Sequence, residues 1–326
     1  MKVLIFSDPH LFLDRKAHFT RDSSIRREAL SKQTLVTLLD NYRGYFTVCA
    51  GDFFNSFSNS ETNILESVGL ASRMDKILAG NHDHSKRTEV RSSMDVLKHL
   101  VPEFVVTEPE AYPVSQTSVF YLVPHQLTQE KFEGVLNGCK KQLKKGYKYY
   151  LFVHCNYSPW HEQEEGTLSL SRSQAQELLS AGFNRIFIGH EHAPREDFDG
   201  RVVVIGNTYP TGFADLSSKR HLILDPDADE LQSVVHWRME DHYSESPDEP
   251  NKLFYDLPAG TDPKKVVELF RGGALGVRLG TSDVVREQRV ITRVDKLPDV
   301  ISHRISQEDP QLEQLWKELA ASVEVD

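Results

Sequence analysis

Short apolar runs with polar residues at both ends recur along the chain, and most of them follow a polar, helix-compatible stretch. The runs cover residues 3–6, 46–50, 76–79, 149–153, 185–188 and 202–205. Consecutive apolar positions without alternation are typical of strands that are buried on both faces of a parallel sheet. Helices are predicted over residues 24–40, 61–72, 128–144 and 171–181. Strands that alternate with helices predict a layered α/β domain, in which ligands bind at the loops beyond the carboxyl ends of the strands.

The apolar pattern stops at residues 240–252, a charged and proline-containing segment without periodicity. We predict a domain boundary there, between a large domain over residues 1–240 and a small C-terminal α+β domain over residues 252–304. Residues 264–304 carry nine Lys and Arg against five Asp and Glu. The small domain is therefore a candidate cap that guides DNA, the alternative being an ordinary module with exposed arginines.

The C-terminal tail, residues 305–326, carries six acidic residues against one lysine. After an Asp-Pro pair that resembles a helix start, an apolar stripe follows at helical spacing. The stripe consists of Leu312, Leu315, Trp316 and Leu319. The sequence predicts an acidic amphipathic helix that binds a partner protein or packs on the chain's own C-terminal domain.

Composition places the chain among globular proteins, since 39% of its 326 residues are hydrophobic and 26% are charged. Its apolar runs are far shorter than the roughly 20 residues that a membrane-spanning helix needs, and its start lacks the pattern of a secretory signal. Three cysteines favour reduced thiols over a disulfide framework, so we expect a cytoplasmic protein without membrane contact. The net charge of −10 excludes a global basic field, so DNA binding would depend on local patches or metals.

Metal-ligand side chains directly follow five of the predicted strands. They are Asp8, His10, Asp52, Asn81, His154, His190 and His192. Carboxylate, amide and imidazole donors suit manganese, iron or zinc, and this set exceeds what a single ion binds, which predicts two ions with Asp52 as the natural bridge. Ordinary polar loop residues are the alternative for any one motif, but five motifs in this order at strand ends favour a metal site.

Asp8-x-His10, Gly51-Asp52, Gly80-Asn81-His82-Asp83, His154 and Gly189-His190-x-His192 resemble the motifs of the calcineurin-like metallophosphoesterase superfamily. The resemblance covers about residues 1–240 and implies a layered β-sandwich flanked by helices. Within the superfamily the chain is most similar to the SbcD-type DNA repair exonucleases, in a short phage-like version. A strand over residues 202–205, a Gly-Asn-Thr-Tyr-Pro loop, a strand over residues 221–224 and the small C-terminal domain favour that branch.

The resemblance implies roles for the motif residues. One ion would be held by Asp8, His10, Asp52 and His192, and the other by Asp52, Asn81, His154 and His190. In a phosphodiester displacement by a metal-activated water, His82 would protonate the leaving oxygen as a general acid or stabilise it in the transition state, and Asp83 would orient His82. Asn55 stands where the repair nucleases often carry a second active-site histidine, so that contribution is missing or comes from elsewhere.

We predict that Asn55, Arg15 and Arg21 contact the substrate. The two arginines belong to residues 11–32, which carry six Lys and Arg against three acidic residues and emerge from the first ligand loop. A solvated helix face is the alternative. The histidines His84, His125, His161 and His221 lie near or between the motifs and are assigned no role.

The resemblance implies an exonuclease or endonuclease of DNA repair or recombination. It would use two divalent ions, with manganese expected, and would work as a homodimer with a coiled-coil ABC-type ATPase subunit. The chain has no glycine loop for ATP phosphates, so any ATP-driven step belongs to that partner. A small-molecule phosphodiesterase, phosphatase or nucleotide pyrophosphohydrolase with the same centre is the alternative, and only the basic C-terminal domain and the amphipathic tail favour DNA. A silent scaffold is disfavoured because every expected ligand and His82 are present.

Overall fold

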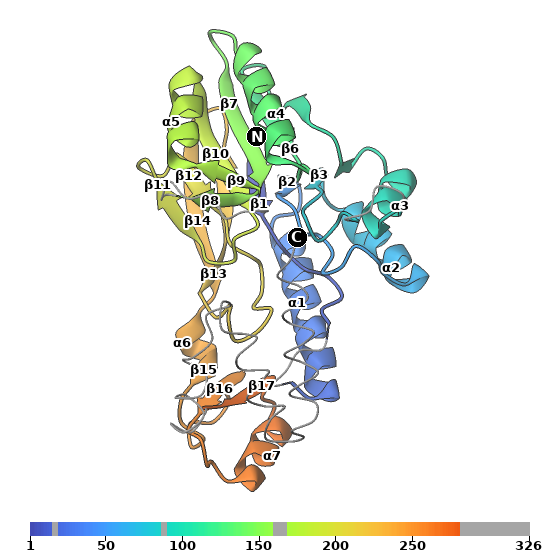
Figure 1. The fold of residues 1–326 in the computed structure, drawn as a ribbon, viewed down its shortest axis with the longest axis vertical. Helices are drawn as coiled ribbons and strands as arrows, with labels where there is room; N and C mark the ends of the chain where they lie inside the picture. The colour runs from blue at the N-terminus through green and yellow to red at the C-terminus, as the bar shows by residue number, and fades with distance from the viewer. Residues whose placement is uncertain (15–18, 86–89, 159–167, 281–326) are drawn as a thin grey trace, which may run out of the picture.

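The structure is a computed structural model, and it describes residues 1–14, 19–85, 90–158 and 168–280. Two six-stranded sheets form the body of the molecule, helices lie on their outer faces, and a small three-stranded sheet lies at one end (Figure 1). The predicted α/β class is confirmed.

The first sheet contains the N-terminal strands. Its order is β14 (Glu230–Trp237), β13 (Lys219–Asp225), β1 (Val3–Phe6), β2 (Phe46–Cys49), β3 (Lys76–Leu78) and β4 (Val105–Val106). Strands β1 to β4 are parallel, and the helices α1 (Arg21–Asn41), α2 (Glu61–Ala71) and α3 (Ser93–Leu100) connect them. Strand β13 pairs with β1 in the antiparallel direction. The carboxyl ends of β1, β2 and β3 therefore meet at one edge of the sheet.

The second sheet is also mainly parallel. Its order is β11 (Arg195–Asp197), β12 (Val202–Val204), β10 (Phe183–Gly189), β7 (Lys148–His154), β6 (Ser118–Val123) and β5 (Glu110–Pro113). The helices α4 (Gln129–Lys141) and α5 (Arg172–Ala181) precede β7 and β10, and β8 (Asn156–Ser158) pairs with β9 (Ser169–Ser171) beside them. Gly189 pairs with His154 at the carboxyl ends of β10 and β7.

The core explains why the strand sequences show no alternation. In β1, Val3 and Ile5 belong to the cluster between the two sheets, whereas Leu4 and Phe6 pack against the helices on the outer face. Both faces of the strand are thus buried, and every position must be apolar. The clusters on the two outer faces hold α1 to α3 on the first sheet and α4 and α5 on the second.

The C-terminal part of the described chain forms the small sheet. It contains α6 (Met239–His242), β15 (Tyr243–Ser244), β16 (Phe254–Leu257), α7 (Pro263–Arg271) and β17 (Gly276–Leu279). It packs on the body through a cluster that includes Phe19 and Phe254. Arg26 of α1 also donates to the carbonyls of Phe270 and Ala274 at 3.2 Å each.

The predicted boundary segment 240–252 includes α6 and β15, so it contributes a strand to the small sheet. The division of the chain into domains stays a prediction, and residues 281–304 and the tail 305–326 lie outside the described residues. Among the helices in the described part of the chain, none is long and apolar enough to cross a bilayer.

Candidate metal centre

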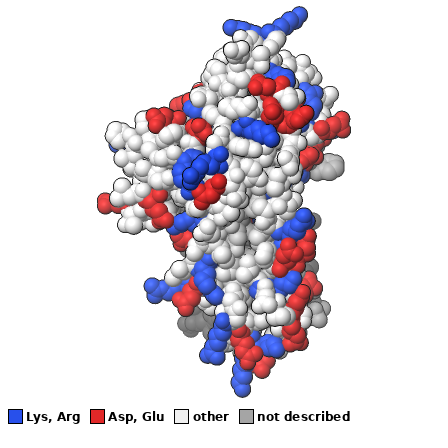
Figure 2. Space-filling model, turned by 180° about the vertical axis from the view of Figure 1, so that it is seen from behind, with Lys and Arg blue, Asp and Glu red and all other residues white. Residues whose placement is uncertain are grey.

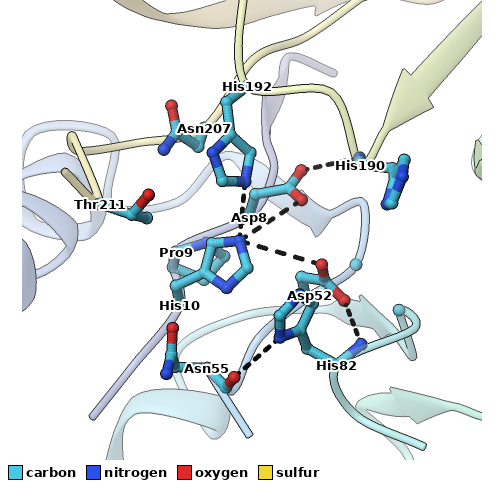
Figure 3. A network of polar contacts seen from close by, with 12 residues as sticks. Asp8, Pro9, His10, Asp52, Asn55, His82, His190, His192, Asn207 and Thr211 are labelled. Atoms are coloured by element: carbon cyan, nitrogen blue, oxygen red, sulfur yellow. Dashed lines mark hydrogen bonds and ion pairs between the residues drawn. The ribbon is translucent and has the colours of Figure 1, made fainter. Parts of the chain in front are cut away.

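The predicted ligand residues lie together at the carboxyl ends of the strands. Asp8 and His10 follow β1, Asp52 follows β2 and Asn81 follows β3 in the first sheet. The second sheet contributes His154 from the end of β7 and His190 and His192 after β10. Figure 3 shows several of these side chains pointing toward one another around Asp8 and Asp52. Five strand ends that are far apart in sequence thus supply one site.

The loop backbone turns the ligand side chains inward at an energetic cost. Asp8, His10, Asp52 and His190 have φ angles of 52°, 44°, 46° and 97°, in a region that residues with a Cβ rarely adopt. Each such residue costs on the order of 1–3 kcal/mol and persists where the surroundings enforce it. Backbone hydrogen bonds from Asp8 to Gly51 (3.0 Å) and from His10 to Asp52 (3.1 Å) hold the first two ligand loops together.

Two glycines let the ligand loops approach each other closely. A Cβ on Gly80 would lie 2.1 Å from Oδ1 of Asp52, and a Cβ on Gly189 would lie 2.2 Å from the carbonyl oxygen of Ala50. Such contacts are far too short for any side chain. Glycine is therefore required here for space.

The first group of donors surrounds His10. Its Nε2 lies 2.9 Å from Nε2 of His192 and 3.9 Å from Oδ1 of Asp8 and from Oδ2 of Asp52. Oδ1 of Asp8 is buried and has no hydrogen-bond partner among the described residues. Two imidazole nitrogens that face each other beside an unpartnered carboxylate oxygen form a donor set that fits one cation.

The second group surrounds His154. Its Nε2 lies 3.3 Å from Oδ1 of Asp52 and 3.1 Å from Oδ1 of Asn81. Nδ1 of His190 lies 2.8 Å from the same Asn81 oxygen. Because Asp52 directs Oδ2 to the first group and Oδ1 to the second, its carboxylate is placed to bridge two ions. The residues present therefore fit two divalent cations, and the assignment of each residue to one ion stays a prediction.

Other residues fix the orientation of the ligand rings. Nδ1 of His154 donates to the carbonyl of Ala50 at 2.8 Å, so that Nε2 faces Asp52 and Asn81 as the candidate ligand atom. His192 has a carboxylate partner, since its Nδ1 lies 3.1 Å from Oδ2 of Asp215. Sequence reasoning missed Asp215, because it lies in a loop before β13 and no local motif marks it.

Asp215 is itself held tightly. It is 8% exposed, and it accepts from the side-chain amide of Asn207 at 2.6 Å and from the backbone N–H of Thr211 at 2.9 Å. The ammonium of Lys219, which is fully buried, is its ion-pair partner. Although burial opposes ionisation, hydrogen bonding to His192 and the charge of Lys219 hold the pKa of Asp215 well below its usual range. Asp215 is therefore a fixed negative charge behind His192.

Burial sets the protonation of the ligand imidazoles. It lowers the pKa of His10 to about 3 and, together with the neighbouring His154, that of His190 to about 4. Burial also opposes protonation of His154, but the Asp52 carboxylate outweighs it and raises the pKa of His154 to about 9. At neutral pH His10 and His190 thus offer free lone pairs, whereas His154 must release a proton when it becomes a ligand.

The predicted general acid, His82, lies at the exposed side of the site. One of its ring nitrogens lies within 4.8 Å of donor atoms of His10 and Asp52. Its Nδ1 lies 2.8 Å from the backbone carbonyl of Asn55, and its backbone N–H donates to Oδ1 of Asp52 at 2.8 Å (Figure 3).

The carboxylate of Asp83 contacts the backbone of the ligand loops and not the His82 ring. This buried carboxylate accepts the backbone N–H groups of Phe53, Phe54 and Gly80 at 3.1, 2.8 and 2.8 Å. Among the described residues it makes no hydrogen bond to the His82 ring, which is oriented by the Asn55 carbonyl instead. Asp83 therefore holds the two ligand loops in register, and only indirectly positions His82.

Two other arginines of the basic segment 11–32 are used inside the protein. Arg27 is fully buried, donates to the Thr211 carbonyl at 2.7 Å and lies over the Phe19 ring, while Arg26 binds the small sheet. Arg21 is exposed at the start of α1. The side chain of Asn55 donates to Asp14 at 3.0 Å. Arg15 lies outside the described residues.

Comparisons with known proteins give a match to one family model. The family model of calcineurin-like phosphoesterases matches residues 1–196, and no curated protein matches the chain. Among solved structures, an archaeal phosphodiesterase is 15% identical with a TM-score of 0.35, and the match covers 72% of this chain and all of that one.

Two structures of Vps29 also match. The protein from Entamoeba histolytica, a single mutant, is 12% identical over 72% of this chain and 99% of its own, with a TM-score of 0.31. The protein from Chaetomium thermophilum is 13% identical over 73% of this chain and 95% of its own, with a TM-score of 0.28. Similarity at this level carries no inference about function.

Proposed function

The chain belongs to the calcineurin-like phosphoesterase family, and we propose that it is an SbcD-type DNA nuclease, an exonuclease or endonuclease that uses two divalent ions, preferably manganese. The observation that carries the catalytic part of this proposal is the pair of donor groups that share Asp52. Bound there, two ions would activate a water molecule and neutralise charge on a phosphoryl oxygen. Imidazole-rich donors suit manganese better than magnesium, which prefers oxygen ligands.

The protein's own residues supply the proton transfer. With Nδ1–H of His82 donating to the Asn55 carbonyl, Nε2 is the ring nitrogen that gives a proton to the leaving oxygen. His82 is exposed, unlike the buried ligands around it, so it can meet a substrate from the solvent side.

Support for DNA as the substrate comes from the part of the chain beyond the metal centre. Arg26 of α1 binds the end of α7 and the segment after it, and α7 carries the exposed Lys264 and Arg271 together with Lys265, which pairs with Asp248 at 3.0 Å. The basic stretch continues in sequence to residue 304. Figure 2 shows acidic and basic side chains interspersed on the face that it presents. DNA would therefore be attracted through the metals and local cationic residues rather than through a broad positive field.

The proposal includes a cytoplasmic homodimer with a coiled-coil ATPase partner. The apolar stripe of residues 312–319 is the proposed attachment, and it lies outside the described residues. Co-purification of the full chain and of a chain ending before Asp309 tests this part. Equal recovery of the ATPase with both chains would rule the stripe out.

The nuclease proposal is tested with end-labelled linear duplex DNA, purified full-length protein and manganese. Bis(p-nitrophenyl) phosphate and p-nitrophenyl phosphate are hydrolysed in parallel as a generic diester and monoester. We expect manganese-dependent shortening of the labelled strand and turnover of the diester above the monoester. Diester turnover without DNA cleavage under any metal would assign the chain to the small-molecule phosphodiesterases, and monoester turnover alone to the phosphatases.

A further inference from the structure

A second polar cavity adjoins the metal centre. It has a volume of about 260 Å³, and its lining includes His84, His125 and Gln126. The His125 ring lies 6.4 Å from the ring of the ligand His154 and 6.3 Å from the ring of His84, measured between centroids. The His125 ring is thus a neighbour both of the predicted ligand His154 and of His84, which lines the cavity with it. The metal-site motifs include neither His84 nor His125.

The cavity contains unused hydrogen-bonding atoms. Nε2 of His84, Nδ1 of His125 and Oε1 of Gln126 are all buried and without a hydrogen-bond partner among the described residues. Gln126 is only 3% exposed, and its amide nitrogen is fixed by the carbonyl of Pro124 at 2.8 Å. Leaving such groups unpaired costs about 1–3 kcal/mol each, so the cavity is prepared for a ligand with both donors and acceptors.

The charges around the cavity disfavour a second phosphate. Asp95 and Glu108 contribute two carboxylates to the lining, against the single ammonium of Lys131. A phosphate group of the substrate is therefore expected at the metal centre, and a neutral group attached to that phosphate is better suited to the cavity. Histidine rings also offer faces on which a planar base can stack.

The volume of the cavity further limits which ligands fit. Pockets for drug-sized ligands measure about 300–1,000 Å³, so a cavity of about 260 Å³ suits one base with its sugar and little more. We propose that this cavity is a nucleoside subsite, in which His84, His125 and Gln126 bind the base and sugar next to the scissile phosphate. The inference rests on the proposed phosphodiesterase function and names the part of the substrate that the site selects.

Two substrates that differ only in the nucleoside test the subsite. Thymidine 5′-(p-nitrophenyl phosphate) and methyl p-nitrophenyl phosphate release the same leaving group at the same metal centre. We expect the wild-type ratio of kcat/KM between them to be at least about tenfold, the range that base stacking provides. His125→Ala and Gln126→Leu should each lower this ratio several-fold, chiefly through KM for the thymidine ester. His99→Ala, which removes an exposed histidine of α3, is the matched control and should leave the ratio unchanged.

A binding measurement separates this inference from the proposed function. Calorimetric titration with thymidine 5′-monophosphate and with inorganic phosphate needs no turnover, and we expect the nucleotide to bind about tenfold tighter in the wild type only. If neither ester is hydrolysed while this preference exists, the proposed function fails and the subsite stands. Equal affinities for the nucleotide and for phosphate would overturn the subsite. A kcat/KM ratio between the two esters that neither His125→Ala nor Gln126→Leu changes would also overturn it.

The two sources of a nucleoside are distinguished with DNA ends. A duplex whose terminal nucleotide lacks its base is compared with the intact duplex. If the wild type cleaves the abasic end more slowly than the intact end, and His125→Ala cleaves both ends at the same rate, the subsite binds the nucleotide at a DNA end. Discrimination with the thymidine ester but not with DNA supports a subsite for free nucleotides.

Discussion

The Nδ1 atom of His192 lies 3.1 Å from Oδ2 of Asp215, while Nε2 of the same ring points into the metal centre at 2.9 Å from Nε2 of His10. A carboxylate behind a ligand imidazole fixes the ring and increases its basicity. Asp215 is in turn bound by Asn207, Thr211 and the buried Lys219. Residues outside the predicted ligand set thus orient one of the predicted ligands.

We expect Asp215→Asn to weaken binding at one of two manganese sites by about 10–100-fold, the usual effect of removing a partner behind a metal ligand. Manganese titration by calorimetry measures this directly. Asp227→Asn, which alters an exposed carboxylate away from the site, serves as the control. Unchanged affinity at both sites would show that the Asp215 contact does not act on the metal.

Asp52→Asn should lose at least one ion and nearly all activity. A neutral amide is a poor bridge between two dications, and Asp52 is the one side chain here that faces both donor groups. The metal content of the dialysed protein decides the matter. Two ions retained at wild-type affinity would contradict the bridging role.

His82→Ala is expected to keep both ions and to lose phosphodiester cleavage by about 10²–10⁴-fold, the contribution of a positioned general acid. Geometry alone also allows His82 to be a ligand of the first ion, because a ring nitrogen lies within 4.8 Å of donor atoms of His10 and Asp52. Metal analysis of the variant separates the two roles. If an ion disappears together with activity, His82 is a ligand.

Removal of divalent ions with a chelator should abolish hydrolysis, and manganese should restore far more activity than magnesium. The reason is the donor set, in which four imidazoles accompany only two carboxylates and one amide. Hydrolysis of bis(p-nitrophenyl) phosphate is measured after each addition. Full recovery with magnesium alone would contradict the preference.

The stability of the fold should fall in mild acid through His221. Burial and the neighbouring His236 lower the pKa of His221 to about 4, whereas an unfolded histidine titrates near 6.5. On acidification, the unfolded state therefore binds this proton at a higher pH than the folded state does. The contribution of His221 to the free energy of unfolding is fully present above about pH 6.5 and decreases as the pH falls toward 4, by at most about 3 kcal/mol.

The variant His221→Gln tests this contribution. It loses the contact of His221 with the hydroxyl of Tyr42 at 2.8 Å and should be less stable at pH 7, but with a smaller further loss between pH 6.5 and 4. Urea unfolding of the manganese-loaded protein provides the measurement, with His99→Gln as the control. Parallel pH curves for the wild type and His221→Gln would exclude His221 as the source.

Several elements could not be identified from the pattern alone. The helices α3 and α7 contain only 8 and 9 residues, too few for periodicity to distinguish a helix from a loop. Both carry the usual start signals, a capping Ser92 in one case and Asp262 with Pro263 in the other. The strand β6 has the same apolar character as the predicted strands, and its pairing with β7 and β5 identifies it.

The sequence by itself determined the position of each ligand. A ligand that follows a buried parallel strand is specified by a few consecutive residues, and parallel strands bring their carboxyl ends to the same edge. This local rule placed Asp8 and Asp52 at one sheet edge before any contact was known, whereas His154 ends a strand of the second sheet. The assignment of these residues to two ions is implied by the family resemblance and not by this local rule.

Only the tertiary structure decided which residues support those ligands. Asp215 contacts His192, which lies 23 positions earlier in the sequence. Arg27 donates to the Thr211 carbonyl inside the protein. Asp83 binds loop backbone rather than the His82 ring. The cavity beside His125 is likewise lined by segments that are far apart in the chain, since His84, Glu108 and Gln126 all contribute to it. Hydrogen bonds and cavities depend on distances between segments that are remote in the chain, and no local spacing encodes those distances.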